Sequence, residues 1–253
     1  MRRSRALFTL AGAGVLALGS TSFAAASAHV RPAAVACNQA ALVAAVTAAN
    51  AAGGGTITLT IGCTYTLTAS HGNDGVNGPD GLPIITTPIT FSGNADVITR
   101  ATTAAAFRIA QVTTTGAITL NAVTLSGGDA TAVTDDNGGG ILSFGAVTLT
   151  GSQLSANTAG GLGGALYGSG AASASTFTSS TVKNNTAHQG AGLAVVHATF
   201  TTTSTVITDN AATVDPGGIY FVAGTATLTT TSITANTPTN CVGSPSPVPG
   251  CIG

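Results

Sequence analysis

The segment GGIYFVAGTATLTTTSITANTP (residues 217–238) is the last of four similar stretches that decide the fold. Each stretch opens with small residues and one aliphatic residue, continues through a threonine-rich middle, and ends in an aliphatic-x-x-Asn motif. The leading aliphatic residues are 25, 27 and 26 positions apart: Ile141, Leu166, Leu193 and Ile219. A period near 26 with three short alternating runs per unit is typical of a solenoid built from β-coils.

The asparagine that ends each unit has a structural interpretation. Coils of a solenoid stack about 4.8 Å apart, so a repeated asparagine lies on its own copy and forms a hydrogen-bonded ladder. The four asparagines are Asn157, Asn185, Asn210 and Asn236. Gly128 occupies the same position in an earlier, looser unit. Along each run, alternation places aliphatic residues inside and threonine outside, where its branched side chain suits a pleated surface.

The sequence therefore predicts an all-β fold, a right-handed single-stranded parallel β-helix forming one domain over residues 29–253. Residues 37–55 are Ala-rich and are predicted to form a capping helix and lead-in, with Leu42, Val43 and Val46 covering the first coil. The β-coils occupy 56–240, and the Pro-rich tail 241–253 closes the far end. Such caps are needed because the terminal coils expose unpaired backbone and an apolar interior.

The N-terminus predicts export. MRRSRALFTLAGAGVLALG has a basic start and a short apolar run, and ASA before His29 fits a cleavage site, so residues 1–28 are predicted to be a signal peptide. No segment is apolar for long enough to span a membrane. The chain after residue 28 has four cationic side chains against eight aspartates, a net charge of −4. We therefore expect a secreted monomer with no nucleic-acid partner.

Four cysteines in an exported chain predict disulfides. Three pairings are possible, and we favour the sequence-local pairs Cys37–Cys63 and Cys241–Cys251, each of which would fix one end of the solenoid. No Cys-x-x-Cys spacing suggests a metal site. The loop 70–83 contains Asp74, Asn77 and Asp80, but their spacing misses that of an EF-hand calcium loop. No cofactor is therefore expected, with calcium in this loop as the alternative.

The repeats resemble those of polymorphic outer-membrane-protein-type sequences. The start of the chain, with GGGTITL, GCTYTL and DGLP, is similar to secreted bacterial parallel β-helix proteins of the pectate-lyase-like group. This resemblance covers nearly all of residues 37–251 and implies the fold, whereas proteins of this group include lyases, hydrolases and adhesins. In size and layout the chain also resembles small secreted hyaluronate lyases, without a diagnostic motif.

The repeat alignment predicts where chemistry would lie. If the leading aliphatic residues point inward, the residues after them point outward: Leu142, Tyr167, Ala194 and Tyr220. One coil earlier, FRIA would place Arg108 on the same outward face. The small residues before the aliphatic positions predict a shallow trough: Gly140, Ala165, Gly192 and Gly218. His188 lies in a loop that leads into this strand, near Tyr167 in the alignment.

The favoured hypothesis is a polysaccharide lyase that cleaves a uronate-containing polymer such as hyaluronan. Such a β-elimination needs a cation or amide at the carboxylate, a base and an acid. Arg108 would neutralise the carboxylate, and His188 and Tyr167 would exchange the protons. Further substrate contacts are predicted for Lys183, Asn184, Tyr220, Gln189 and Asn137. Lys183 has a second interpretation, as a surface ion pair with Asp209 in the next coil.

Two other functions remain open. A glycoside hydrolase would need two carboxyl groups about 5–9.5 Å apart, which Asp135, Asp136 and Asp215 are the candidates to supply. A non-catalytic surface or adhesive β-helix would instead use its threonine-rich faces. Ice binding is disfavoured, because the repeats vary between 25 and 27 residues and lack a strict Thr-x-Thr grid. A lyase should gather its aromatic and ionisable side chains on one face, whereas an adhesin should scatter them.

Overall fold

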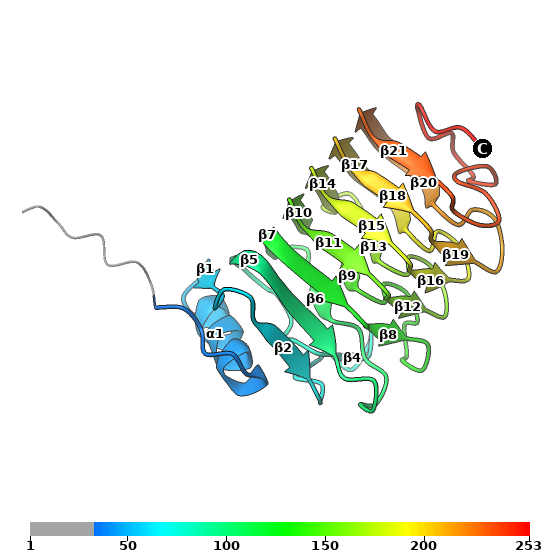
Figure 1. The fold of residues 1–253 in the computed structure, drawn as a ribbon. Coiled ribbons are helices and arrows are strands. Elements are labelled where there is room, and N and C mark those ends of the chain that lie inside the picture. Colours follow the sequence, from blue (N-terminus) through cyan, green and yellow to red (C-terminus); the bar gives the residue numbers. More distant parts are fainter. Residues whose placement is uncertain (1–32) are drawn as a thin grey trace, which may run out of the picture. The chain divides into compact units, whose positions relative to one another are not determined.

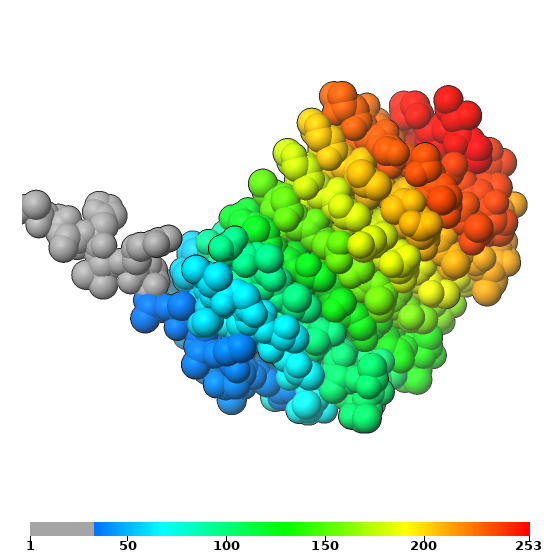
Figure 2. All heavy atoms as spheres, viewed as in Figure 1, coloured from blue at the N-terminus to red at the C-terminus, as the bar shows by residue number. Residues whose placement is uncertain are grey.

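The computed structural model describes residues 33–253, so the predicted signal peptide lies outside the described residues. The chain winds into a parallel β-solenoid of about five turns, which confirms the predicted parallel β-helix. Figure 1 shows the strands stacked in order from the helix at one end to the C-terminal tail at the other. In Figure 2 the turns form successive bands along the stack.

The strands of each turn belong to four sets, here called faces A to D. Face A contains β6 (Ala110–Val112), β9 (Ile141–Ser143), β13 (Leu166–Ser169) and the first halves of β17 (Leu193–Thr203) and β20 (Ile219–Thr229). Face B contains β1 (Gly55–Thr58), the first halves of β5 (Pro88–Arg100) and β7 (Ala117–Ser126), β10 (Ala146–Thr150), β14 (Ala174–Thr178) and the second halves of β17 and β20.

Face C contains β2 (Thr64–Leu67), the second halves of β5 and β7, β11 (Gln153–Ser155), β15 (Thr181–Lys183), β18 (Val206–Thr208) and β21 (Ser232–Thr234). Face D contains the two-residue strands β8 (Asp129–Ala130), β12 (Thr158–Ala159), β16 (Thr186–Ala187) and β19 (Ala211–Ala212). The predicted excursion 70–83 holds a small antiparallel hairpin of β3 (Gly72–Asn73) and β4 (Pro79–Asp80). The alternating strand pattern thus produces one continuous apolar interior, and the outward residues of each face are free to differ.

The capping helix α1 (Gln39–Ala51) forms where the Ala-rich segment predicts it. Asn38 caps its N-terminus by accepting a hydrogen bond from the Ala41 amide at 2.9 Å. Leu42 and Val46 are fully buried against the first coil, whereas Val43 is only half-buried. The helix therefore covers the apolar end of the solenoid with two of the three predicted residues.

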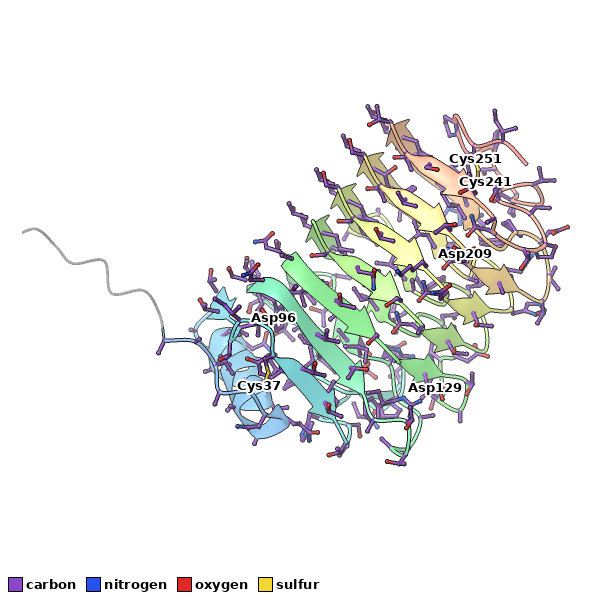
Figure 3. All side chains as sticks on the ribbon, viewed as in Figure 1. Cys37, Asp96, Asp129, Asp209, Cys241 and Cys251 are labelled. Atoms are coloured by element: carbon purple, nitrogen blue, oxygen red, sulfur yellow. A yellow bond between two sulfur atoms is a disulfide. The ribbon has the colours of Figure 1, made fainter. Side chains whose placement is uncertain are left out.

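Both predicted disulfides are present, and Figure 3 labels Cys37 at one end and Cys241 and Cys251 at the other. The predicted asparagine ladder is also confirmed. The side-chain amide of each asparagine donates to the next one, with Asn157–Asn185 at 3.0 Å and Asn185–Asn210 at 2.9 Å. The ladder continues to Asn236 and then to Asn240, which the tail supplies from outside the repeats. The C-terminal tail thus closes both the apolar core and the polar ladder.

The turns between faces B, C and D have constant length. Residues 117–130, 146–159, 174–187 and 199–212 each run through the three faces in 14 residues. Among these four repeats, the variation in length therefore falls in the turns that enter and leave face A. Left-handed residues mark the constant corners: Ala122, Ser179, Ser204 and Thr230 between faces B and C, and Ala156, Asn184, Asp209 and Ala235 between C and D.

Among the described residues, no helix combines the length and apolarity that crossing a membrane requires. The two disulfides are compatible with an extracellular protein. Secretion itself stays a prediction.

Candidate functional site

The residues predicted to point outward on face A do align in one row, but Leu142 and Ala194 are fully buried in it. Arg108 does not belong to this row. Strand pairing aligns Leu142, Tyr167, Ala194 and Tyr220 in one row, and Gln111 is the residue that precedes them. Arg108 lies three residues upstream of Gln111, before β6 begins. The prediction that Arg108 shares this row is wrong because the first coil aligns on Ala110 and not on Phe107 or Ile109.

Arg108 is also fully buried, contrary to the predicted accessible position. The excursion loop covers it, so that its guanidinium bonds to the carbonyls of Asn77 (2.9 Å) and Asp135 and to the carboxylate of Asp80 (3.3 Å). Two of the three candidate calcium ligands, Asn77 and Asp80, therefore bind a guanidinium. Arg108 anchors the excursion loop to the solenoid, and no part of its side chain is exposed for contact with a polymer.

This buried group of side chains perturbs two carboxyl groups. Burial raises the pKa of Asp80 to about 7, and the attraction of Arg108 offsets only part of that increase. The pKa of Asp74 lies well below its usual range. Desolvation alone would raise this pKa, but hydrogen bonds from the Asn77 and Val76 amides and the Gln111 side chain outweigh the desolvation. Three buried polar atoms here have no partner within residues 33–253: Asp80 Oδ2, Arg108 Nε and Gln111 Oε1.

His188 follows β16 on face D, where its side chain is exposed. Its Nδ1 lies 3.0 Å from the hydroxyl of Thr213 in the next turn. The hydrogen bonds of the described residues do not link His188 to Tyr167, which lies half-buried on face A. The two predicted proton-transfer residues thus belong to different faces of the solenoid.

Two of the predicted contact residues, Gln189 and Asn137, have structural roles. Gln189 donates to the Asp215 carbonyl at 2.7 Å, and Asn137 joins Asp135 to the Leu162 amide. Asn184 has a φ of 56° at the corner between faces C and D, where Ala156 and Ala235 take the same conformation. Tyr220 is half-buried, and its Cβ packs against the turn at Gly190. The side chains of Asn184 and Tyr220 make no hydrogen bond within residues 33–253.

Lys183 is the last residue of β15 and points outward from face C, between Ser155 and Thr208. Within residues 33–253 the ion pairs are Arg100–Asp129 and Arg108–Asp80, so the alternative pairing with Asp209 is wrong. The Asp209 carboxylate accepts instead from Thr208, at 3.0 Å. Lys183 therefore lies on a different face from Tyr167 and from His188.

The small residues that predicted a trough have another cause. Gly140, Gly192 and Gly218 are buried at the corner that holds the asparagine ladder. A Cβ on Gly140 would lie 2.4 Å from the Ala165 carbonyl oxygen, and one on Gly218 would lie 2.3 Å from the Asn240 carbonyl oxygen. These positions are small because the next coil leaves no room for a side chain, and they do not form the floor of an open trough.

The third candidate carboxylate, that of Asp215, does not join those of Asp135 and Asp136, which are neighbours in the sequence. Backbone hydrogen bonds place Asp136 beside Gly161, Gly161 beside His188, and His188 beside Val214, which precedes Asp215. Asp136 and Asp215 are thus three turns apart, about 14 Å along the stack, beyond the separation that a glycosidase pair needs. Figure 3 shows Asp96, Asp129 and Asp209 well separated over the molecule. Among residues 33–253, no group of three His, Cys, Asp or Glu side chains is suited to hold a metal ion.

Face B carries the feature that the sequence analysis missed. Strand pairing aligns seven threonines in one row: Thr56, Thr90, Thr119, Thr148, Thr176, Thr201 and Thr227. A parallel row two residues later contains Thr58, Ser92, Asn121, Thr150, Thr178, Thr203 and Thr229. The last four strands therefore form a strict Thr-x-Thr grid, and the prediction that the repeats lack one is wrong. We call the outward surface of face B the threonine face.

The grid survives because, in the four repeats from Ala117 to Ala212, length changes occur only in the turns on either side of face A. No side chain hydroxyl of the seven-threonine row makes a hydrogen bond within the described chain, and no outward residue of the threonine face is charged. Comparison of the whole chain with known proteins gives no match to a family model, a curated protein or a solved structure.

Proposed function

We propose that the protein is a non-catalytic extracellular β-helix that adheres through its threonine face to a neutral, ordered polysaccharide surface. The observation that carries this proposal is the aligned row of seven threonines with free hydroxyls. Neighbouring rungs repeat about every 4.8 Å, and successive outward positions on a strand about every 6.6 Å. Each hydroxyl both donates and accepts, so the face presents a regular lattice of uncharged hydrogen-bonding groups.

The distribution of ionisable side chains supports binding over catalysis. Tyr167 lies on face A, His188 on face D and Lys183 on face C, and Arg108 is buried in an ion pair. An elimination needs its acid, base and carboxylate-binding group around one substrate atom. The lyase hypothesis and its acidic polymer thus have less support than adhesion to a neutral polymer.

A sedimentation assay with insoluble cellulose, chitin and xylan tests this proposal. The wild-type protein should bind at least one of them, and the triple variant Thr148→Val, Thr176→Val, Thr201→Val should bind at least about tenfold less. Valine keeps the shape and strand preference of threonine and removes only the hydroxyl. The matched control replaces Thr66, Thr208 and Thr234 on face C with valine and should bind like the wild type.

The same samples are incubated with hyaluronan, pectate and chondroitin. Release of ultraviolet-absorbing unsaturated uronate would establish elimination and overturn the proposal, as would equal binding by the wild type and the face B triple variant. Absence of sedimentation with every polysaccharide would also overturn it.

Ice is a second candidate ligand, and the strict Thr-x-Thr pairs of β10, β14, β17 and β20 favour it. A flat, uncharged lattice of hydroxyl and methyl groups can order water in a pattern that continues into a crystal. Thermal hysteresis and inhibition of ice recrystallisation by the wild type, both lost in the face B triple variant, would establish ice as the ligand. Normal ice growth at millimolar protein would exclude it.

A further inference from the structure

A depression of about 360 Å³ runs along the corner where face B meets face C. It crosses four successive turns, from Asn94 in the first to Thr181 in the fourth, and ten residues line it. Four turns span three stacking steps, about 14 Å. We call this depression the corner groove, and we propose that it binds a single neutral oligosaccharide chain parallel to the solenoid axis.

The shape of the groove follows from its floor. The corner position carries Ala95, Ala122, Gly151 and Ser179 in successive turns, all with positive φ. Because these residues have at most two side-chain heavy atoms, the corner is hollowed between the outward side chains of the two faces. The first turn also has two extra residues between the strand positions Ser92 and Asp96, which builds one end of the groove at Asn94.

The chemistry of the lining selects the ligand. The hydroxyls of Thr124 and Thr181 and the side-chain amide of Asn94 make no hydrogen bond within the described chain. Gln153 uses only its amide nitrogen, which donates to Ser155 at 3.0 Å and leaves its oxygen free. Hydroxyls and amides that both donate and accept match the hydroxyls of a sugar chain. The methyl groups of Ala95 and Ala122 offer small apolar contacts to its ring carbons.

Other extended ligands fit the groove poorly. None of its ten lining residues is charged, so nucleic acids and uronate polymers would meet no cation. An extended peptide is normally bound by pairing with a free strand edge. Here the strands beside the groove are already paired on both sides, as β7 is with β5 and β10 and β11 is with β7 and β15. A neutral sugar chain needs neither a cation nor an edge.

The floor is rigid, which favours binding without a large ordering cost. Beneath it, Ser152 donates to the Leu120 and Thr150 carbonyls and accepts from the Val123 amide. Ser180 continues this pattern by accepting from the Ser152 amide and donating to Thr178. These buried serines hold the backbone of two turns beneath the groove.

Calorimetric titration with cellohexaose, xylohexaose and laminarihexaose tests the inference, which rests on the proposed adhesion to neutral polysaccharide. The wild type should bind at least one hexasaccharide, and Thr181→Trp should weaken that binding at least tenfold by filling the groove. Tryptophan is acceptable at an outward strand position. Thr234→Trp, on the same face but outside the groove, is the matched control and should bind like the wild type.

The failures of the two proposals are distinguishable. If the wild type sediments with insoluble polysaccharide but binds no hexasaccharide, adhesion stands and the corner groove is overturned as a site. Unchanged hexasaccharide affinity in Thr181→Trp would also overturn it. If Thr181→Trp loses the hexasaccharide yet still sediments, both sites exist and act separately.

Discussion

The solenoid buries polar side chains in two different ways. In the asparagine ladder each buried amide meets its own copy in the next turn, and Asn185 fulfils every donor and acceptor role with Asn157, Asn210 and nearby carbonyls. Under the excursion loop, Arg108 and Asp80 form one ion pair that leaves three buried polar atoms without a partner in the described chain. Repetition satisfies buried polar groups turn by turn, whereas a single insertion has only the partners that happen to surround it.

The largest expected effect comes from removing one member of the ion pair. Asp80→Ala leaves the guanidinium of Arg108 buried without a carboxylate, which should cost about 3–5 kcal/mol of unfolding free energy. Urea unfolding measures the loss, and hydrogen exchange should rise first in residues 72–80. Asp209→Ala is the control, since Ala156 and Ala235 already hold the equivalent corner. If both substitutions lower the unfolding free energy equally, the loss of the buried ion pair is no more costly than the loss of an exposed carboxylate.

The pH dependence separates the two carboxyl groups of the excursion loop. Asp80 has a pKa raised from 3.8 to about 7, so its contribution to stability is full below pH 3.8 and is lost as the pH rises through 7. Asp74 has a lowered pKa, so its contribution is present above 3.8 and is lost as the pH falls further. The loop should therefore be most stable near pH 4.

Relative to Asp80→Asn, the wild type should lose roughly 3–4 kcal/mol between pH 4 and pH 7. Urea unfolding of both proteins at several pH values measures this difference. Parallel pH profiles for the two proteins would contradict the raised pKa of Asp80. The asparagine ladder has no titratable member and should not contribute to the pH dependence of stability.

A smaller loss is expected from the ladder. Asn185→Ala removes the link between Asn157 and Asn210 and leaves buried carbonyls and amides unpaired, a cost of about 2–3 kcal/mol. Its neighbour Asn184 is exposed, so Asn184→Ala should change stability by less than about 0.5 kcal/mol. Urea unfolding midpoints compare the pair. If Asn185→Ala lowers the unfolding free energy no more than Asn184→Ala does, the stacking of the coils, and not amide pairing, stabilises that corner.

The smallest effect is a gain. Ala156 has a φ of 53°, which costs a residue with a Cβ about 1 kcal/mol. Ala156→Gly removes this cost but makes the unfolded chain more flexible, so a net gain of about 0.5 kcal/mol is expected. Thr148→Gly, in an extended strand, should instead destabilise. A thermal melt that ranks the two variants the other way round would contradict the role of the left-handed corner.

The features predicted correctly are those that the sequence repeats. The period near 26 predicted the coils, and the aliphatic-x-x-Asn motif predicted a ladder that the structure extends to Asn240. Gly128 lies in the ladder position as expected, where its amide donates to Asn157. Both disulfides are the sequence-local pairs that we favoured among the three possible pairings.

The wrong predictions concern a residue that a distant loop covers and a row of residues whose spacing the variable turns obscure. Arg108 looked accessible because nothing in the residues 107–110 shows that the loop 70–83 folds back over them. The threonine grid was dismissed because the period was measured between residues of face A, and the turns that vary lie on both sides of that face. Counted from face B to face D, each repeat has the same 14 residues, and the alignment of Thr148, Thr176 and Thr201 would have been visible.

The constant 14-residue segment also makes this protein a natural scaffold for engineering. Different lengths are already tolerated in the turns that lead into face A, as residues 131–140 and 160–165 show. Foreign peptides placed in these turns would be displayed at intervals of one coil, about 4.8 Å apart. Because the rest of each repeat keeps its register, a library of displayed loops could be varied without disturbing the threonine face behind them.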